Sequence, residues 1–275
     1  MSVYDHGFLY GDGVYETLRV YQGIAFQIEE HIERLFRSAA MIDLSIPKSQ
    51  GAIKRAVYAT LKANRHKEAV VRITLSRGEG PTGLDPALCS SPTFVIMSHL
   101  LRPYPEKYYK RGVKIAIVKT RRNYDRALNP QIKSLNFLNN ILAGIEARKE
   151  GAVEGIMLNY KNFIAEGTVS NVFLIRDGVL CTPAVRAGIL DGITRGLIIE
   201  CAKELHMKVK EGRFRKEDLV AADEVFISNT TMEVMPVSTI NDTIISSRPG
   251  SITKKLHRTY RKKINEYIKE GGGKR

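Results

Sequence analysis

The interpretation of this chain starts from QIKSLNFLNNIL (131–142). Within it, Lys133 stands just ahead of an apolar run with helical spacing, which predicts a helix from there to about residue 149. Packed surroundings would remove water from such a lysine and favour its neutral, nucleophilic amine over the ammonium form. An ordinary surface lysine is the more common case among 43 Lys and Arg residues, so a chemical role for Lys133 needs support from other parts of the sequence.

Length and composition indicate a folded globular protein. The chain has 275 residues, 43% of them hydrophobic, which is enough to fill one large core or two smaller ones. It has no run of about 18 apolar residues that could span a bilayer. The start, MSVYDHG (1–7), also lacks the basic-then-apolar order of a secretory signal. We therefore expect a cytoplasmic protein with no membrane partner.

The cysteines, histidines and charges narrow the classes of ligand. Cys89, Cys181 and Cys201 form no CxxC pair, and the six histidines show no HxxxH or HExxH spacing, so we expect buried thiols and no metal site. A net charge of +14 suggests an anionic partner, either nucleic acid or a small phosphate- or carboxylate-bearing ligand. The basic runs, which include Arg121-Arg122, are not interleaved with aromatic residues or glycines. They predict solvated surface and no nucleic-acid partner.

The order of elements predicts two domains that each mix helices and strands. Residues 1–122 predict a small α+β domain, and residues 133–275 a larger one. The polar segment between them, 123–132, predicts an interdomain linker. The predicted helices are 29–44, 47–61, 133–149, 194–206 and 252–268; the predicted strands include a hairpin turning at Gln22-Gly23, then 70–75, 93–97, 112–119, 155–158, 171–175, 179–182, a strand near 209, and 224–227.

A second group of residues suggests a site for a charged ring with a phosphate. Glu166 lies between apolar strand segments, where an ionised carboxylate needs a positive partner such as a protonated pyridine nitrogen; a solvent-exposed turn glutamate is the plainer alternative. GILDGITRG (188–196) leads into the helix expected from Thr194. The unpaired N–H groups in the first turn of that helix favour a phosphate, although a plain threonine cap is the commoner arrangement. Gly192 would allow close approach, and Asn229-Thr230-Thr231 offers further hydroxyls.

Six stretches, in this order along the chain, resemble the class IV (fold-type IV) pyridoxal-phosphate aminotransferases. They are YGDGVYE (10–16), HIERL (31–35), KSLN (133–136), Glu166-Gly167, GITR (192–195) and NTTMEVMP (229–236). That family includes branched-chain aminotransferase, D-amino-acid aminotransferase and aminodeoxychorismate lyase. The resemblance implies an α+β fold with a small α/β sandwich domain and a larger domain with a β-barrel-like core. It also implies pyridoxal 5'-phosphate as cofactor and a homodimer with the active site near the subunit boundary.

The resemblance assigns roles to individual residues. It implies that Lys133 is the Schiff-base lysine and the catalytic proton carrier, and that Glu166 is the partner of the pyridine nitrogen. The remaining cofactor contacts would come from Arg34, Leu190, Gly192, Ile193, Thr194 and Thr230, with Leu190 packed on the ring and the others around the phosphate. Substrate contacts would come from Tyr10, Tyr15, Arg19 and Thr231.

The substrate preference is less sharply implied. D-specific relatives trap the substrate carboxylate with an Arg-x-His pair, and the matching positions here are Thr82 and Leu84. We therefore expect a transaminase that acts on a branched-chain or similar L-amino acid with 2-oxoglutarate. Phe137 stands where branched-chain enzymes have a tyrosine, and residues 15–19 are closer to the lyase and D-specific members. Aminodeoxychorismate lyase and D-amino-acid transaminase therefore remain alternatives, and a basic nucleic-acid-binding protein is the alternative from another class.

Overall fold

The computed structural model describes residues 2–246 and 248–272, and the chain forms two compact units. Of the described residues, the first unit comprises 2–102, 132–137 and 264–272, and the second comprises 103–131, 138–246 and 248–263. Each unit has its own sheet and its own hydrophobic core. Among the described helices, none is both long and apolar enough to cross a membrane.

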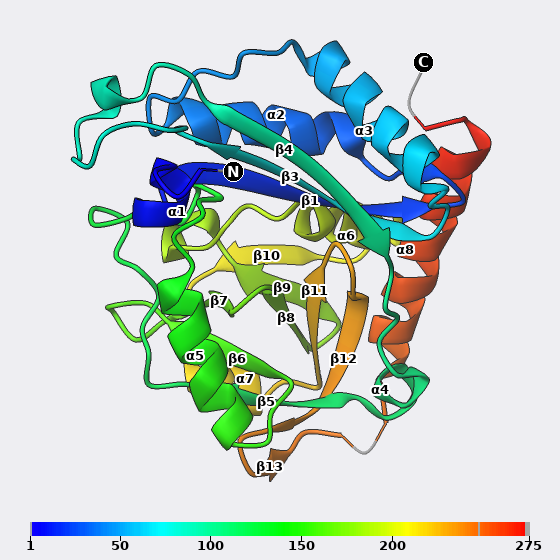
Figure 1. Ribbon diagram of the computed structural model, residues 1–275. Helices are drawn as coiled ribbons and strands as arrows, with labels where there is room; N and C mark the ends of the chain where they lie inside the picture. The colour runs from blue at the N-terminus through cyan, green and yellow to red at the C-terminus, as the bar shows by residue number, and fades with distance from the viewer. Residues whose placement is uncertain (1, 247, 273–275) are drawn as a thin grey trace. The chain divides into compact units, whose positions relative to one another are not determined.

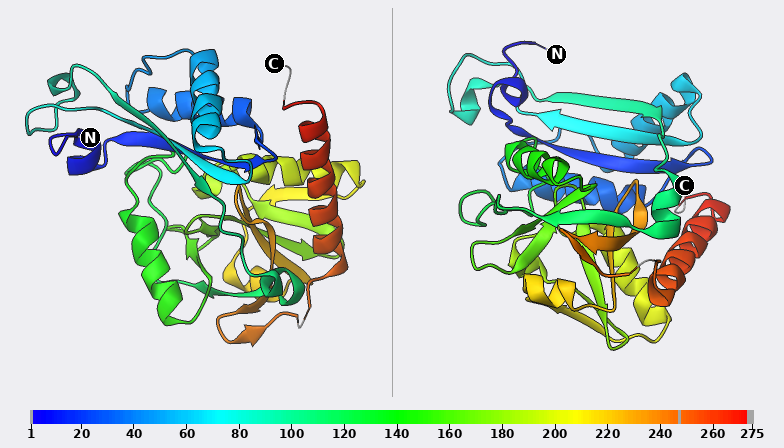
Figure 2. Two further views of the ribbon diagram at one scale, coloured as in Figure 1. Left: turned by 45° about the vertical axis from the view of Figure 1, so that its right-hand side comes forward. Right: turned by 90° about the horizontal axis from the view of Figure 1, so that it is seen from below.

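The first unit is a four-stranded antiparallel sheet covered by two helices. Its strands follow the order β2-β1-β3-β4 (Figure 1). The helices α2 and α3 pack on one face of this sheet (Figure 2), because their apolar stripes, with Ile32, Leu35 and Ile53, are buried in one core with Leu18 and Ile73 of the strands. The elements are α1 (His6–Tyr10), β1 (Gly13–Tyr21), β2 (Ile24–Ala25), α2 (Ile28–Ala40), α3 (Gln50–Asn64), β3 (Ala69–Ser76), η1 (Pro86–Leu88) and β4 (Thr93–Leu100).

The second unit is built on a nine-stranded mixed sheet, in which eight strands follow the order β10-β9-β8-β11-β12-β5-β6-β7 and β13 pairs with β12. Ile164 on β7, at one end of this order, shares a core with Leu174 on β8 and Ile227 on β11, so the sheet curls around that core. The elements are α4 (Glu106–Arg111), β5 (Val113–Ile117), α5 (Leu138–Lys149), β6 (Glu154–Leu158), β7 (Ile164–Gly167), β8 (Asn171–Arg176), β9 (Val179–Pro183), η2 (Val185–Ala187), α6 (Ile193–Glu204), β10 (Val209–Gly212), α7 (Lys216–Val220), β11 (Glu224–Asn229), β12 (Glu233–Ile240), β13 (Thr243–Ile244) and α8 (Ser251–Lys269), whose last turns belong to the first unit.

The α+β fold class is confirmed, and so are the elements with strong local patterns. The hairpin turns at Gln22 and Gly23, both with positive φ (50° and 84°), as a tight turn between twisted strands requires. The helices predicted at 194–206 and 252–268 correspond to α6 and α8. The strands β7, β12 and β13 were not predicted, nor were the short helices α1, α4 and α7.

The placement of two segments differs from the prediction. The strand expected at 112–119 is β5, but it pairs in parallel with β12 and β6 of the second sheet and does not join the first. The first unit therefore ends at residue 102 in this part of the chain, and not near 122. The predicted linker also belongs to the second unit as far as Gln131, whose side-chain amide donates to the carbonyl of Ile189.

The segment that carries Lys133 is extended and not helical, which corrects the predicted helix start. Tyr15 N donates to Lys133 O at 3.0 Å, and Leu135 N donates to Gly13 O at 2.9 Å, so residues 133–135 run beside the start of β1. A Cβ on Gly13 would come within 2.8 Å of the Leu135 side chain, so glycine permits this approach. The helix α5 begins only at Leu138.

Candidate active site

In the first unit, the amine of Lys133 lies against an aromatic ring. Its Nζ is 3.2 Å from Tyr15 Oη and 4.4 Å from the centroid of the Tyr15 ring. A second cation contacts the same ring, because Arg72 Cζ lies 3.9 Å from the centroid. Phe137 packs edge-on at 5.5 Å. The structure therefore brings together an amine, a phenol and a guanidinium, a combination that suits a carbonyl-bearing, anionic ligand.

Helix α2 holds this segment through a polar stripe that faces β1. Ser38 Oγ accepts a hydrogen bond from Lys133 N at 3.2 Å. One turn earlier, Arg34 Nε and Nη2 donate to the two oxygens of Glu16 at 2.7 and 2.9 Å, and His31 Nδ1 lies 2.7 Å from Glu16 Oε2. His31, Arg34 and Ser38 recur at helical spacing on α2, so all three side chains face β1.

The charges in this cluster are fixed by their neighbours. Burial raises the pKa of Glu16, but Arg34 and His31 lower it by a larger amount, so this pKa lies well below its ordinary value. Burial lowers the pKa of His31; Arg34 and Lys133 also lower it, and Glu16 opposes them. Glu16 is therefore an anion and His31 is neutral with Nδ1–H donating to it. Arg34 is held in one orientation by two parallel hydrogen bonds.

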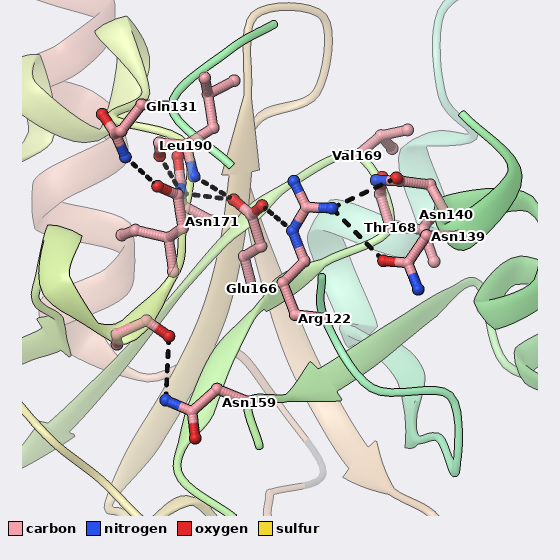
Figure 3. Close-up of polar contacts among 12 residues, drawn as sticks. Arg122, Gln131, Asn139, Asn140, Asn159, Glu166, Thr168, Val169, Asn171 and Leu190 are labelled. Atoms are coloured by element: carbon pink, nitrogen blue, oxygen red, sulfur yellow. Dashed lines mark hydrogen bonds and ion pairs between the residues drawn. The ribbon is translucent and has the colours of Figure 1, made fainter. Parts of the chain in front are cut away.

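In the second unit, Glu166 is the centre of a buried polar network (Figure 3). Arg122 Nε donates to Oε1 at 2.8 Å, while Leu190 N and Asn171 Nδ2 donate to Oε2 at 2.9 and 3.4 Å. The solvent-exposed alternative for Glu166 is wrong, since its side chain is 7% exposed on β7. The prediction of a solvated Arg122 is also wrong, because its guanidinium is needed to balance this carboxylate and is 9% exposed.

The N-terminus of α6 lies next to this network. Ile193 is the first helical residue, Gly192 is the N-cap, and no side chain caps the helix, so the threonine-cap alternative is wrong. A Cβ on Gly192 would lie only 2.1 Å from Asn171 Oδ1, which explains the glycine. Thr194 is buried in the first turn. Uncapped N–H groups at the positive end of a helix dipole favour an anion.

A tight turn after β11 supplies hydroxyls. Asn229 Oδ1 accepts from Thr231 N at 2.9 Å, from Thr231 Oγ1 at 3.1 Å and from Met232 N at 2.8 Å, which fixes the backbone around Thr230. Just before it, Ser228 Oγ is buried and has no hydrogen-bond partner among the described residues. An orphaned buried hydroxyl usually indicates an unfilled acceptor or donor position.

Two predicted substrate residues, Tyr10 and Arg19, have their polar partners outside the Lys133 group. Tyr10 is partly exposed at the end of α1, where its hydroxyl accepts from Gly83 N at 3.1 Å. Arg19 lies four residues beyond Tyr15 on β1, with its guanidinium 4.5 Å from the Tyr21 ring centroid and 3.6 Å from Glu68. Four strand residues correspond to about 13 Å, so Arg19 occupies the other end of the strand.

Sequence reasoning missed several charged residues of these groups. The motifs contain Glu16 and His31 without a predicted role for either residue, and no sequence pattern predicts a role for Arg72. The available signal for Glu16 was a charged residue in an otherwise apolar strand, which is costly unless it is paired. For Arg72 and Arg122 no local signal existed, because their partners lie far away in the chain.

The donor set fits pyridoxal phosphate. Its aldehyde requires an amine, its protonated ring nitrogen a carboxylate, and its phosphate the N–H groups and hydroxyls of a helix N-terminus. The first unit offers such an amine as Lys133; the second unit offers the carboxylate as Glu166 and the phosphate donors around Gly192 and Thr230, and its Ser228 Oγ is left to be satisfied. Fold and residues together define a pyridoxal-phosphate enzyme of fold type IV.

Comparison with known proteins identifies the family. The profile of the family described as "Amino-transferase class IV" matches residues 13–240, and the chain belongs to this family. A Methanocaldococcus jannaschii protein, provisionally named branched-chain-amino-acid aminotransferase, is 41% identical over 262 residues, covering 95% of this chain and 90% of its own. The aminodeoxychorismate lyase of Bacillus subtilis is 36% identical over 276 residues, covering 100% of this chain and 93% of its own.

A solved structure supports the same assignment. The branched-chain aminotransferase of the thermophilic archaeon Thermoproteus uzoniensis, solved with norvaline, is similar with a TM-score of 0.89 at 34% identity, covering 95% of this chain and 88% of its own. Enzymes of this family depend on pyridoxal phosphate and act on small amino and 2-oxo acids.

Proposed function

We propose that this protein is a transaminase that moves an amino group between a branched-chain or similar L-amino acid and 2-oxoglutarate. The observation that carries the proposal is the position of Lys133, whose backbone is fixed on β1 and whose amine lies against Tyr15. An amine held by backbone hydrogen bonds is pre-organised for covalent work.

The cofactor, when bound, supplies an aldehyde that bonds to an amine and a ring that accepts electrons from the substrate α-carbon. In this proposal Lys133 Nζ would hold the aldehyde until the amine of the substrate displaces it, and the freed amine of Lys133 would then carry the proton of the α-carbon. Glu166, balanced by Arg122, accepts the ring N–H. Arg34, Gly192, Ile193, Thr194 and Thr230 hold the phosphate, and Leu190 packs on the ring.

Tyr10, Tyr15, Arg19 and Thr231 are the proposed substrate contacts, to which we add Arg72. A guanidinium beside the phenol and the amine suits the carboxylates of 2-oxoglutarate. The loop of residues 77–86 has no basic side chain at Thr82 or Leu84, which favours the L-amino acid over the D-amino acid.

The test is a panel of L- and D-amino acids mixed with the cofactor-loaded protein, with conversion to the pyridoxamine form followed by absorbance. We expect L-leucine, L-isoleucine and L-valine to react and 2-oxoglutarate to reverse the conversion with formation of glutamate. Reaction of D-alanine without L-leucine would refute the proposed substrate. Borohydride reduction should trap the cofactor on the wild-type chain but not on Lys133→Ala.

A lyase that releases pyruvate from an aminated chorismate is the second candidate, favoured by the Bacillus subtilis relative. The two functions make opposite predictions for one mixture. A dedicated lyase releases pyruvate from aminodeoxychorismate and forms no glutamate from amino acids and 2-oxoglutarate.

The exposed face of α5 supports the proposal of a homodimer. Leu138, Ile141, Leu142 and Ile145 recur at helical spacing and are 62%, 52%, 47% and 45% exposed. Such a stripe is rare on a monomer and typical of a protein interface. Sedimentation should show a dimer that Ile141→Glu dissociates, while a monomeric wild type would refute it. We also propose a cytoplasmic location, which the free thiols Cys89, Cys181 and Cys201 support.

A further inference from the structure

Glu154, which none of the proposed roles uses, is a buried carboxylate bound by five neutral donors. It is the first residue of β6 and is 3% exposed. Oε1 accepts from Gly155 N at 2.9 Å, from Thr168 N at 2.9 Å and from Thr168 Oγ1 at 2.5 Å. Oε2 accepts from Val169 N at 3.3 Å and from Ser170 Oγ at 2.8 Å.

This arrangement is complementary to a side chain that accepts hydrogen bonds at both of its oxygens. All five partners can donate, and three of them are backbone N–H groups that can do nothing else. Among the residues the structure describes, no Lys, Arg or His side chain forms an ion pair with Glu154. The cost of burying its charge is therefore offset by dipoles alone. Four of the five dipoles come from one turn, residues 167–170 between β7 and β8, so the carboxylate fixes the conformation of that turn.

The turn has little freedom to rearrange. Gly167 N donates to Ser170 O at 2.7 Å and closes it. A Cβ on Gly167 would lie 2.2 Å from Ser170 Oγ and 2.9 Å from Glu154 Oε2, so the close packing of carboxylate and turn depends on the glycine. Without the carboxylate, the N–H groups of Thr168 and Val169 would have to find other acceptors.

Three parts of the proposed cofactor site are attached to this turn. Glu166 directly precedes it, and Asn171, which bonds Glu166 and the carbonyl of Leu190, directly follows it. The carbonyl of Val169 accepts from Asn229 Nδ2 at 3.2 Å, and Asn229 holds the Thr230 turn. Figure 3 shows Thr168 and Val169 beside Glu166 and Arg122.

We propose that Glu154 is a positioning residue for the cofactor. Its carboxylate fixes the conformation of the 167–170 turn, and that turn fixes the positions of Glu166 and of the Thr230 turn (residues 229–231). The inference rests on the proposed cofactor roles of Glu166 and Thr230. Loss of the charge should therefore weaken cofactor binding by roughly tenfold, the size seen when supporting hydrogen-bond partners of site ligands are removed.

The experiment compares Glu154→Gln with a matched control, Glu224→Gln. Within the described part of the chain Glu224 also accepts only from neutral donors, namely Ile252 N at 3.0 Å, Thr253 N at 2.7 Å and Thr253 Oγ1 at 2.6 Å, but it caps α8. Both variants should lower the thermal midpoint. Only Glu154→Gln should raise the dissociation constant of pyridoxal phosphate and, at saturating cofactor, reduce the visible circular dichroism band of the bound ring.

Each result decides the matter. Equal dissociation constants and equal circular dichroism for the two variants would overturn the proposal, leaving Glu154 as a stability residue. If Glu154→Gln does not fold, Thr168→Val, which removes one of the five donors, should weaken cofactor binding about threefold, a smaller loss than that of the whole carboxylate. No change there would also overturn it. A wild-type chain that binds no pyridoxal phosphate would instead overturn the proposed function and this inference together.

Discussion

Replacing Arg122 by Met should destabilise the protein strongly, because it leaves the carboxylate of Glu166 buried without its cation. The two side chains are 9% and 7% exposed and their closest atoms are 2.8 Å apart. Removing one partner of a buried ion pair costs about 3–5 kcal/mol in unfolding free energy. The Leu190 N–H remains bonded to the other carboxylate oxygen, so we expect a value near the lower end, about 3 kcal/mol.

The assay is urea unfolding of the cofactor-free chain for wild type, Arg122→Met, Glu166→Gln and the double variant. In the double variant neither position of this pair carries a buried charge, so it should be more stable than Arg122→Met, with a coupling energy of about 2 kcal/mol. Arg37→Met is the control, since Arg37 and Glu33 form an ion pair at 3.9 Å with side chains 60% and 57% exposed. Its effect should be about 0.5 kcal/mol or less. A loss of stability in Arg122→Met no larger than in the control would refute the reasoning.

Three further outcomes follow from local geometry. Burial raises the pKa of Glu16, but Arg34 and His31 lower it by more, so ionised Glu16 stabilises the fold above its unfolded pKa of 4.5 and this stabilisation is lost as the pH falls. Between pH 6 and 3.5 the Glu16→Gln variant should therefore lose less stability than the wild type, and parallel pH profiles would contradict this. Gly192→Ala should lower unfolding free energy by about 1–3 kcal/mol and weaken cofactor binding, because its Cβ would lie 2.1 Å from Asn171 Oδ1; a crystal structure of the variant with Asn171 unmoved would contradict this. Burial raises the pKa of the Cys201 thiol to about 12, so a thiol reagent at pH 8 should label it only after unfolding, and labelling in the native protein would contradict the buried position.

The parts of the fold that were predicted correctly depend on neighbours in sequence. The hairpin at Gln22-Gly23 and the helices α6 and α8 are set by local periodicity and turn chemistry. The prediction of Lys133 and Glu166 as site residues came from their apolar surroundings in sequence and from the order of the family motifs. In the structure the Lys133 amine contacts the Tyr15 hydroxyl, and the Glu166 carboxylate accepts a hydrogen bond from Leu190 N. The catalytic role of Lys133 and the cofactor-binding role of Glu166 stay predictions.

The parts that were not predicted depend on partners far along the chain. β5 looks like any short β-branched strand, and only its parallel pairing with β12, more than a hundred residues later, decides which sheet it joins. The segment at Lys133 carries a helical pattern, but backbone bonds to Gly13 and Tyr15 override it. Arg122 is exposed or buried according to a carboxylate 44 positions away.

The first unit is assembled from three separate pieces of the chain, and this affects the order of events during biosynthesis. Residues 132–137 complete the edge of β1, and Tyr267, near the end of α8, packs on Phe26 with ring centroids 5.1 Å apart and donates from its hydroxyl to Glu29 at 3.1 Å. When the chain has been synthesised only as far as residue 102, the contacts that close the first unit therefore cannot yet form. The contacts made by residues 132–137 and by Tyr267 can form only after those parts of the chain have been synthesised, so truncation before residue 264 should leave the first unit without its third piece.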